Sequence, residues 1–327
     1  PNGQGMKTFP DGQKYFGEWK DGREWNTKHT KKDGTLLGKY ENGKWIVKLF
    51  VSVGEDGIIF TSSDGNSWTE RTSGTSEDLY EVTYGNGLFV VVGENGTIIT
   101  SPDEHFWTER DSGTSEYLRG VTYGNGLFVT VGYSGTILTS PDGTTWDNRT
   151  SGTLLVLIGV TYGNGTFVTV GQSGTILTSS DGISWDNRTS GTSKFLYGVT
   201  YGNGLFVTVG QNRTILTSSD GISWDDRTTG TSNLLYGVTY GNGLFVTVGW
   251  KGTILTSPDG NSWTKRTSVT SESLYEVTYG NGTFVTVGNS GTILTSSDGT
   301  SWDNRTSGTS NQLLGVTYGN SIFVTVG

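Results

Sequence analysis

Carboxylates are the only side chains of this chain whose number and spacing suggest chemistry. Seven aspartates recur at intervals of 39 residues, each four residues before a tryptophan: Asp64, Asp103, Asp142, Asp181, Asp220, Asp259 and Asp298. The chain has no cysteine, which excludes thiolate metal sites and cysteine nucleophiles. Its two histidines are too few for a His-rich zinc site. Catalysis would therefore depend on carboxylates, and we expect no metal and no cofactor.

The seven tryptophans that follow these aspartates mark an internal repeat. They are Trp68, Trp107, Trp146, Trp185, Trp224, Trp263 and Trp302. Apolar residues alternate with period two within each unit and are interrupted by Gly-Asn-Gly and Asp-Gly turns, which predicts strands. One copy predicts strand A at Leu196–Tyr201, strand B at Leu205–Val209, strand C at Thr214–Thr217 and strand D at Ser223–Thr228. Seven such units predict an all-β, seven-bladed β-propeller over residues 49–327.

The order of the strands along the chain favours a closed ring over a stacked solenoid. A solenoid would need polar capping repeats at its ends, and the sequence shows none. The repeats open at a B strand, Leu49–Val53, so we expect the C-terminal A strand, Leu313–Tyr318, to complete the first blade. One B strand is then surplus, since Ile322–Val326 competes with Leu49–Val53. An unpaired strand of this kind could mediate self-association.

The repeated turn, Ser179-Ser180-Asp181-Gly182-Ile183-Ser184-Trp185 in one copy, resembles the Asp-box (BNR) repeats of sialidase-like and photosystem-assembly-factor-like propellers. The box is one residue shorter than usual between Asp and Trp, and the second copy, Asp103 to Trp107, lacks the glycine. We interpret each aspartate as an acceptor for backbone N–H groups of its own turn, with the glycine at positive φ and the tryptophan packed between blades. Seven equivalent turns do not make one active site.

The arginines of the repeat have a similar interpretation. One follows each tryptophan by three residues: Arg71, Arg110, Arg149, Arg188, Arg227, Arg266 and Arg305. We interpret these seven as a structural ladder, that is, one arginine with the same structural role in every blade. Arg119 and Arg213 are then the arginines of the propeller that do not belong to the repeat. The resemblance implies three arginines that converge on one carboxylate in an active sialidase. We therefore do not expect sialidase activity.

Two glutamates break the repeat inside strand A. Glu81 and Glu276 replace a glycine that stands at Gly120, Gly159, Gly198, Gly237 and Gly315. Both glutamates belong to blades that flank the first blade. Arg119 directly precedes Gly120, the glycine at the same position of another blade. A glycosidase acid and nucleophile need about 5–10 Å between them. We expect two different blades to separate the glutamates too far, and a glycan-acting hydrolase remains the lesser alternative.

The loops that vary among the copies are the expected binding site. The Tyr-Gly-Asn-Gly turns and the Asp turns hardly change, whereas the B–C and D–A loops do, and these two loops emerge on the same face of an antiparallel blade. Binding residues usually lie on loops that a scaffold presents. We expect Tyr117, Tyr133, Phe195 and Trp250 to be exposed aromatic residues on this face, with Lys194, Arg213 and Lys251 beside them. Arg119, Glu81 and Glu276 are further candidates near the channel.

Residues 1–48 form a separate segment. Residues Pro10 to Gly22 resemble one MORN repeat, and a second hairpin between Asp33-Gly34 and Asn42-Gly43 is expected after it. In that family such hairpins serve in docking or near lipids. We interpret the single copy as a capping appendage beside the propeller of residues 49–327.

Charge and hydropathy narrow the partners. Residues 1–48 carry ten Lys/Arg against six Asp/Glu (+4), and the remainder twelve against twenty-five (−13). An acidic propeller does not suit phosphate contacts, so we expect no nucleic acid. No apolar run is long enough to span a membrane. The first expectation is a non-catalytic binding or scaffold propeller for a glycan or protein; the alternatives are a self-assembling structural protein and the hydrolase. The compartment stays open.

Overall fold

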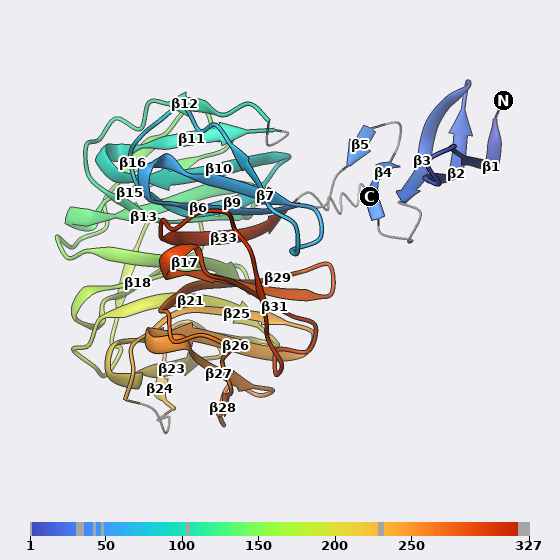
Figure 1. Cartoon of the computed structure of the whole chain (residues 1–327). Helices are drawn as coiled ribbons and strands as arrows, with labels where there is room; N and C mark the ends of the chain where they lie inside the picture. The colour runs from blue at the N-terminus through green and yellow to red at the C-terminus, as the bar shows by residue number, and fades with distance from the viewer. Residues whose placement is uncertain are drawn as a thin grey trace. The chain divides into compact units, whose positions relative to one another are not determined.

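The structure is a computed structural model that describes residues 2–30, 36–41, 44–46, 49–102, 105–227 and 232–319. Two compact units appear in it, and the larger comprises Phe50–Tyr318 (Figure 1). The other unit holds an antiparallel five-stranded sheet in the order β1 (Gly3–Thr8), β2 (Lys14–Lys20), β3 (Arg23–Thr30), β4 (Leu36–Glu41) and β5 (Lys44–Ile46). The residues that resemble a MORN repeat thus form β2 and the turns on either side of it.

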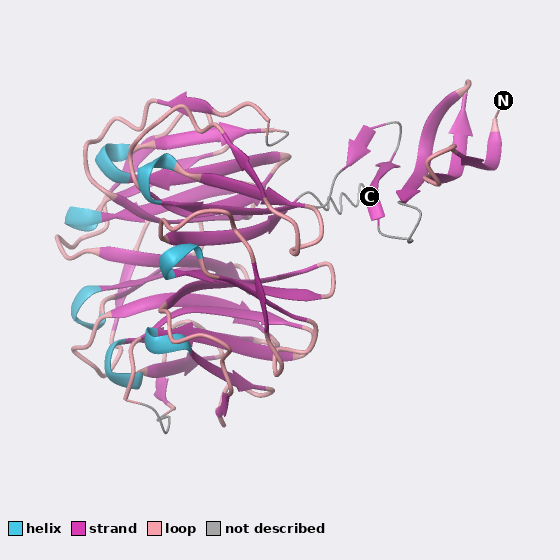
Figure 2. Ribbon diagram, viewed as in Figure 1, coloured by secondary structure: helices cyan, strands magenta, loops and turns pink. Residues whose placement is uncertain are grey.

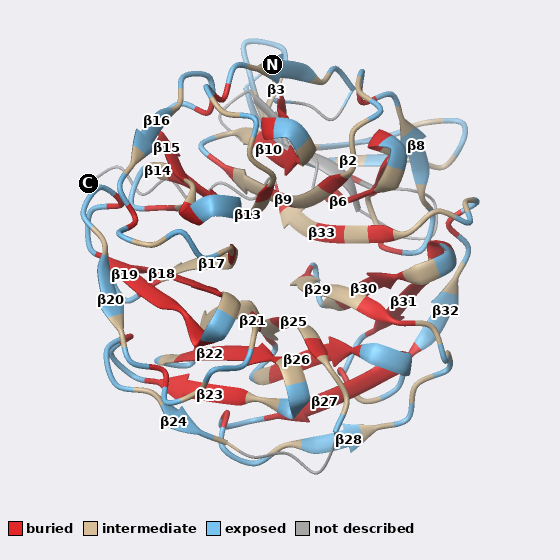
Figure 3. Cartoon of the chain, turned by 90° about the vertical axis from the view of Figure 1, so that its left-hand side faces the viewer, coloured by how far each residue is buried: buried red, intermediate tan, exposed pale blue. Residues whose placement is uncertain are grey.

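Seven four-stranded antiparallel sheets form the larger unit. The inner strands, at position A, are β9 (Leu79–Gly85), β13 (Leu118–Gly124), β17 (Leu157–Gly163), β21 (Leu196–Gly202), β25 (Leu235–Gly241), β29 (Leu274–Gly280) and β33 (Leu313–Gly319). The B strands are β6 (Leu49–Gly54), β10 (Leu88–Gly93), β14 (Leu127–Gly132), β18 (Thr166–Gly171), β22 (Leu205–Gly210), β26 (Leu244–Gly249) and β30 (Thr283–Gly288). The sheets are arranged around a central axis with position A innermost (Figure 3). The expected all-β propeller is confirmed.

The outer half of each blade is shorter. The C strands are β7 (Ile59–Ser62), β11 (Ile98–Ser101), β15 (Ile137–Ser140), β19 (Ile176–Ser179), β23 (Ile215–Ser218), β27 (Thr253–Ser257) and β31 (Ile293–Ser296). The D strands are β8 (Thr69–Arg71), β12 (Thr108–Arg110), β16 (Asp147–Arg149), β20 (Asp186–Arg188), β24 (Asp225–Asp226), β28 (Thr264–Arg266) and β32 (Asp303–Arg305). The prediction of a six-residue D strand over Ser223–Thr228 was wrong, because the preceding turn occupies its first residues; Thr228 itself lies outside the described residues.

The ring closes through the C-terminal strand, as expected. Blade 1 has the order β33-β6-β7-β8, so β6 holds the B position. Phe50 and Leu313 of this blade share one buried cluster with Val285 of blade 7. The competing segment Ile322–Val326 lies outside the described residues.

The core of the propeller lies between the blades and is built mainly from the B strands. Each B strand after the first is buried from its second residue onward, and its Phe is completely enclosed. Phe167 of blade 4, for example, packs with Val129 and Val131 of blade 3, and Trp185 covers the same cluster. Burial of this apolar surface in every interface supplies the main driving force for the ring.

A short 3-10 turn joins B to C in every blade. These turns are η1 (Glu55–Gly57), η2 (Glu94–Gly96), η3 (Tyr133–Gly135), η4 (Gln172–Gly174), η5 (Gln211–Arg213), η6 (Trp250–Gly252) and η7 (Asn289–Gly291). They gather on one face of the propeller (Figure 2). The backbone of each contacts the D–A loop that leads into strand A of the same blade: Glu94 N donates to Asp78 O at 2.9 Å, and Gln211 N to Phe195 O at 2.8 Å. The two variable loops of a blade therefore meet on this face, here called the loop face.

Candidate functional site

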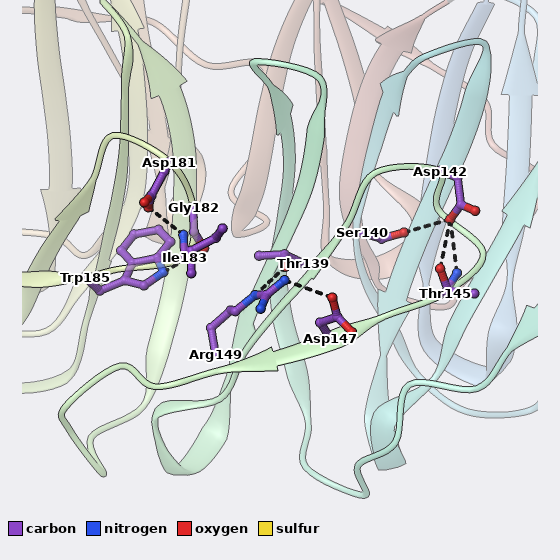
Figure 4. Close-up of polar contacts among 10 residues, drawn as sticks. All are labelled: Thr139, Ser140, Asp142, Thr145, Asp147, Arg149, Asp181, Gly182, Ile183 and Trp185. Carbon is purple, nitrogen blue, oxygen red and sulfur yellow. Dashed lines mark hydrogen bonds and ion pairs between the residues drawn. The ribbon is translucent and has the colours of Figure 1, made fainter.

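The repeated Asp turn is a closed local network. Asp181 Oδ1 accepts the backbone N–H groups of Ile183 and Ser184 at 2.8 and 2.9 Å, and the Ser179 hydroxyl donates to it at 3.0 Å. Trp185 Nε1 donates to Gly182 O at 3.1 Å (Figure 4). These hydrogen bonds, the one from Ser184 first, lower the pKa of Asp181 below its ordinary value. The described carboxylates of this motif serve their own turns, as predicted.

The arginine ladder is structural as well. Arg149 Nε donates to Thr139 Oγ1 at 2.8 Å, and its terminal nitrogen pairs with Asp147 at 2.9 Å (Figure 4). The same Nε-to-threonine bond, of 2.7–2.9 Å, recurs in the other six blades. It joins strand D to strand C. The ladder offers no convergent arginine cluster for an anionic ligand.

The expected binding residues are distributed around the loop face. Tyr133 and Trp250 are exposed, at 39% and 41% of their surfaces. Lys194, Arg213 and Lys251 are exposed too, and the Lys251 ammonium lies over the Trp250 ring at 4.3 Å. Tyr117 and Phe195 are half-buried, contrary to the expectation that they are exposed, because Tyr117 packs on Tyr133 and Phe195 on Tyr197.

A cavity of about 400 Å³ occupies the centre of the ring. All seven inner strands line it, which places it in the central channel that Figure 3 views end-on. Its lining includes Glu81, Glu276 and Arg119, so the structure brings these three predicted residues together. The other seven candidates lie outside this lining.

Bulges in the inner strands aim side chains around the mouth of this channel. In blades 2 to 7 the pairing of strand A with strand B skips one residue near the start of strand A. A β-bulge leaves the extra residue unpaired and redirects its side chain. The bulged residues are Tyr80, Arg119, Ile158, Tyr197, Tyr236 and Tyr275. All six line the cavity.

The four tyrosines of this set, Tyr80, Tyr197, Tyr236 and Tyr275, were missed by sequence reasoning. Three neighbouring rings form a half-circle: the centroids of Tyr197 and Tyr236 are 5.4 Å apart, as are those of Tyr236 and Tyr275. On the other side the Arg119 guanidinium lies 3.9 Å from the centroid of the Tyr80 ring. Variation among the copies could have pointed to this position: it holds Tyr, Arg, Ile or Leu, whereas the leucine before it is the same in every copy.

The two channel glutamates have unusual electrostatics. Each Oε1 accepts the N–H group of the next residue at 2.9 Å, from Val82 for Glu81 and from Val277 for Glu276. Desolvation by burial raises the pKa of Glu276 to about 8. The pKa of Glu81 is also well above its ordinary value, mainly through burial and then through repulsion by Glu276. Burial of both groups, together with the repulsion of Glu81 by Glu276, therefore opposes ionisation of the two carboxyls in the channel.

Neither glutamate belongs to a metal cluster: the part of the chain that the structure describes holds no group of three or more His, Cys, Asp or Glu that could bind a metal ion. Within the same residues no helix is long and apolar enough to cross a membrane.

Fold and channel define the class of this protein: a β-propeller of four-stranded blades with a lined central channel. Solved structures support the class. One described as YCF48 bound to D1 peptide is 17% identical, with a TM-score of 0.61 over 77% of this chain and 86% of that chain. YCF48 from Cyanidioschyzon merolae is 15% identical, with a TM-score of 0.58 over 72% and 87%. At such identities the similarity establishes the propeller fold.

A computationally designed protein, Ika8, covers more of the chain: 90% of this one and 93% of its own, at 12% identity and a TM-score of 0.53. No protein-family model and no curated protein sequence matches the chain.

Proposed function

We propose that this chain is a non-catalytic binding propeller that holds a protein partner on its loop face. The observation that carries the proposal is the ring of bulged side chains at the channel mouth. Bulges redirect side chains at the rims of barrels and near functional sites, and here they present a different set of residues in different blades while the scaffold repeats.

The composition of the rim supports a protein ligand. Tyrosine, tryptophan and arginine are enriched where proteins bind one another, because they bury a large area and keep a polar group for hydrogen bonds. The loop face offers Tyr133, Trp250 and Arg119 beside the tyrosine half-circle. The structure of YCF48 with a D1 peptide provides a precedent for peptide binding on this fold.

A peptide display selection tests the proposal. Peptides that bind the parent are measured against Tyr133→Ala and Trp250→Ala, both on the loop face, and against Ile222→Ala, which removes an apolar side chain of similar exposure, 53%, from a C–D turn. We expect the first two substitutions to weaken binding and the third to leave it unchanged. Equal binding by all variants, or loss only with Ile222→Ala, would reject the loop face.

A glycan array on the same variants tests the other ligand class. Exposed Trp250 and Tyr133 could stack on sugar rings, so glycan binding that Trp250→Ala abolishes, without any selected peptide, would replace the protein partner by a carbohydrate.

A further inference from the structure

We propose that the channel mouth is a receptor for one basic side chain, a lysine or arginine that a partner protein inserts between the tyrosines toward Glu81 and Glu276. The inference rests on the proposed function and specifies its ligand: a peptide segment with a projecting cationic residue. Four features of the described residues support it, namely the uncompensated carboxyls, their exceptional place in the repeat, the aromatic rim and the charge of the surrounding loops.

The carboxyls lack a cation. Each accepts a hydrogen bond from the adjacent backbone, and among the described residues no ion pair is formed by Glu81 or Glu276. The two half-buried carboxyls have raised pKa values, and a nearby cation is the kind of group that favours their charged form. Arg119, on the same cavity wall, stacks on Tyr80. A guest cation would stabilise the ionised form of Glu81 and Glu276 and pair with it.

The two glutamates occupy positions that elsewhere accept only glycine. A Cβ added at Gly159 or Gly198 would come within 2.5 Å of a carbonyl oxygen of the next inner strand, and one at Gly120 likewise. Blades 2 and 7 nevertheless carry full glutamate side chains at this position. Departures from a local rule are expected at functional sites. We therefore treat Glu81 and Glu276, which lie in the inner strands β9 and β29, as a functional feature of the channel.

The aromatic rim suits both the alkyl chain and the charged group of a cationic side chain. Tyr197, Tyr236 and Tyr275 form a half-circle of rings around the entrance, and the ring faces of tyrosine attract cations. Arg119 over Tyr80 is an intramolecular example of the same contact, at 3.9 Å. The cavity of about 400 Å³ lies within the usual range for ligand sites.

The loops around blades 7, 1 and 2 extend the negative potential outward. We call their carboxylates the acidic sector: Glu55, Asp56, Glu77, Asp78, Glu94 and Glu272. They border the same blades that carry Glu81 and Glu276. In the part of the chain that the structure describes, the side-chain hydrogen bonds of this sector come from neutral groups, such as the Tyr80 hydroxyl to Glu94 at 2.7 Å and the Asn95 amide to Glu77 at 2.8 Å. Charge of one sign around a cleft steers the opposite charge into it.

The test uses the whole chain and two peptides, Gly-Gly-Lys-Gly-Gly with blocked ends and its norleucine analogue, which keeps the alkyl stem but has no charge. Binding is followed by NMR chemical-shift titration at pH 8. We expect the lysine peptide to bind at least about tenfold more tightly than the norleucine peptide, and the Glu81→Gln/Glu276→Gln variant to abolish the difference. Glu109→Gln, on exposed strand β12, is the matched control and should bind as the parent does.

Two further arms identify the source of the cation. If an arginine peptide binds more tightly than the lysine peptide, the guest is an arginine. If n-butylammonium alone binds tightly, the site is a receptor for small amines, and the proposal that a partner protein inserts the side chain is wrong. Folding of the double variant is checked by its far-UV spectrum and by an unchanged tyrosine amide pattern outside the channel. If the two peptides bind equally, or if the double variant retains the preference, the inference is wrong.

Its failure is separable from failure of the proposed function. Selected peptides that need Tyr133 and Trp250 would still establish the loop face even if no cation entered the channel.

Discussion

Asn311 Nδ2 donates a hydrogen bond of 3.1 Å to Asp56 Oδ2, which joins residues 255 positions apart in the chain. Beside it, Gln312 N donates to Glu55 Oε2 at 3.2 Å, and Glu55 N donates to Gln312 O at the same distance. These bonds bring the D–A loop before β33 onto the B–C loop after β6. Ring closure thus involves polar contacts of the loops as well as the apolar cluster of Phe50 and Leu313.

Closure leads to the first prediction. Removing 313–327 deletes β33, whose Leu313 and Val316 are buried, and exposes the apolar edges of blades 1 and 7. We expect this truncation to unfold or aggregate, as seen by light scattering and by loss of the cooperative thermal transition. Removing only 322–327 should be mild, because β6 already holds the B position.

Deletion of residues 1–43 provides the control. Phe50–Tyr318 form a compact unit of their own, so this variant should keep the parent's melting temperature within a few degrees. A monomeric truncation at Gln312 with an unchanged melting temperature would contradict closure through β33.

Glu276 carries the second prediction, a pH dependence of stability. Its folded-state pKa of about 8 lies above the ordinary value of 4.5. Between these two values the folded state holds more protons than the unfolded state, so the free energy of unfolding falls as pH rises from about 4.5 to about 8. Glu276→Gln keeps the volume but cannot ionise. We expect the variant to gain stability relative to the parent as pH rises through that window.

Urea unfolding at pH 5 and pH 8 measures this difference, with Glu109→Gln as the exposed control. Equal pH profiles of parent and Glu276→Gln would show that Glu276 is ionised at little cost and that the channel is more hydrated than its enclosure suggests.

The third prediction concerns the Asp turn. Gly182 has a φ of 75°, and a Cβ there would lie 2.6 Å from Leu127 Cδ2 of the preceding blade. Gly182→Ala therefore combines left-handed strain with a clash in the blade interface, and we expect a loss of about 1–3 kcal/mol in the free energy of unfolding. Asp181→Ala removes a backbone acceptor in an exposed turn and should cost about 1 kcal/mol.

Chemical denaturation measures both values. Peptide binding on the loop face should be unchanged in Asp181→Ala, because its turn joins C to D at the other end of the blade. A variant with the parent's stability and lost binding would reverse the structural interpretation of the turn.

The fourth prediction is the absence of sialoside hydrolysis. Each ladder arginine is tied to a threonine of its own blade, and Arg119 is stacked on Tyr80, so no trio of arginines converges in the described residues. A fluorogenic sialoside should give no signal above a heat-denatured sample. Release that Glu81→Gln or Glu276→Gln abolishes would instead make the channel catalytic.

The sequence by itself determined the parts of this protein that repeat. Local turn chemistry is encoded within a few residues, so the Asp181 network and the glycine at positive φ follow from the motif alone. The alternation of apolar residues, repeated with each of the seven tryptophans, specified the blades. The closure followed from strand order, because the repeats begin with the B strand at Leu49 and a final A strand starts at Leu313. Both depend on the pattern along the chain rather than on distance in space.

Only the tertiary structure decided which side chains share the channel. Tyr80, Tyr197, Tyr236 and Tyr275 stand at a position that varies among the copies, and the sequence does not say where their side chains point. A bulge in each of their four strands redirects them toward the mouth. Glu81 and Glu276 are 195 positions apart, and their repulsion appears only when the ring brings blades 7 and 2 to either side of β33. Local propensity carries no information about such distances, because they arise from the packing of seven blades around one axis.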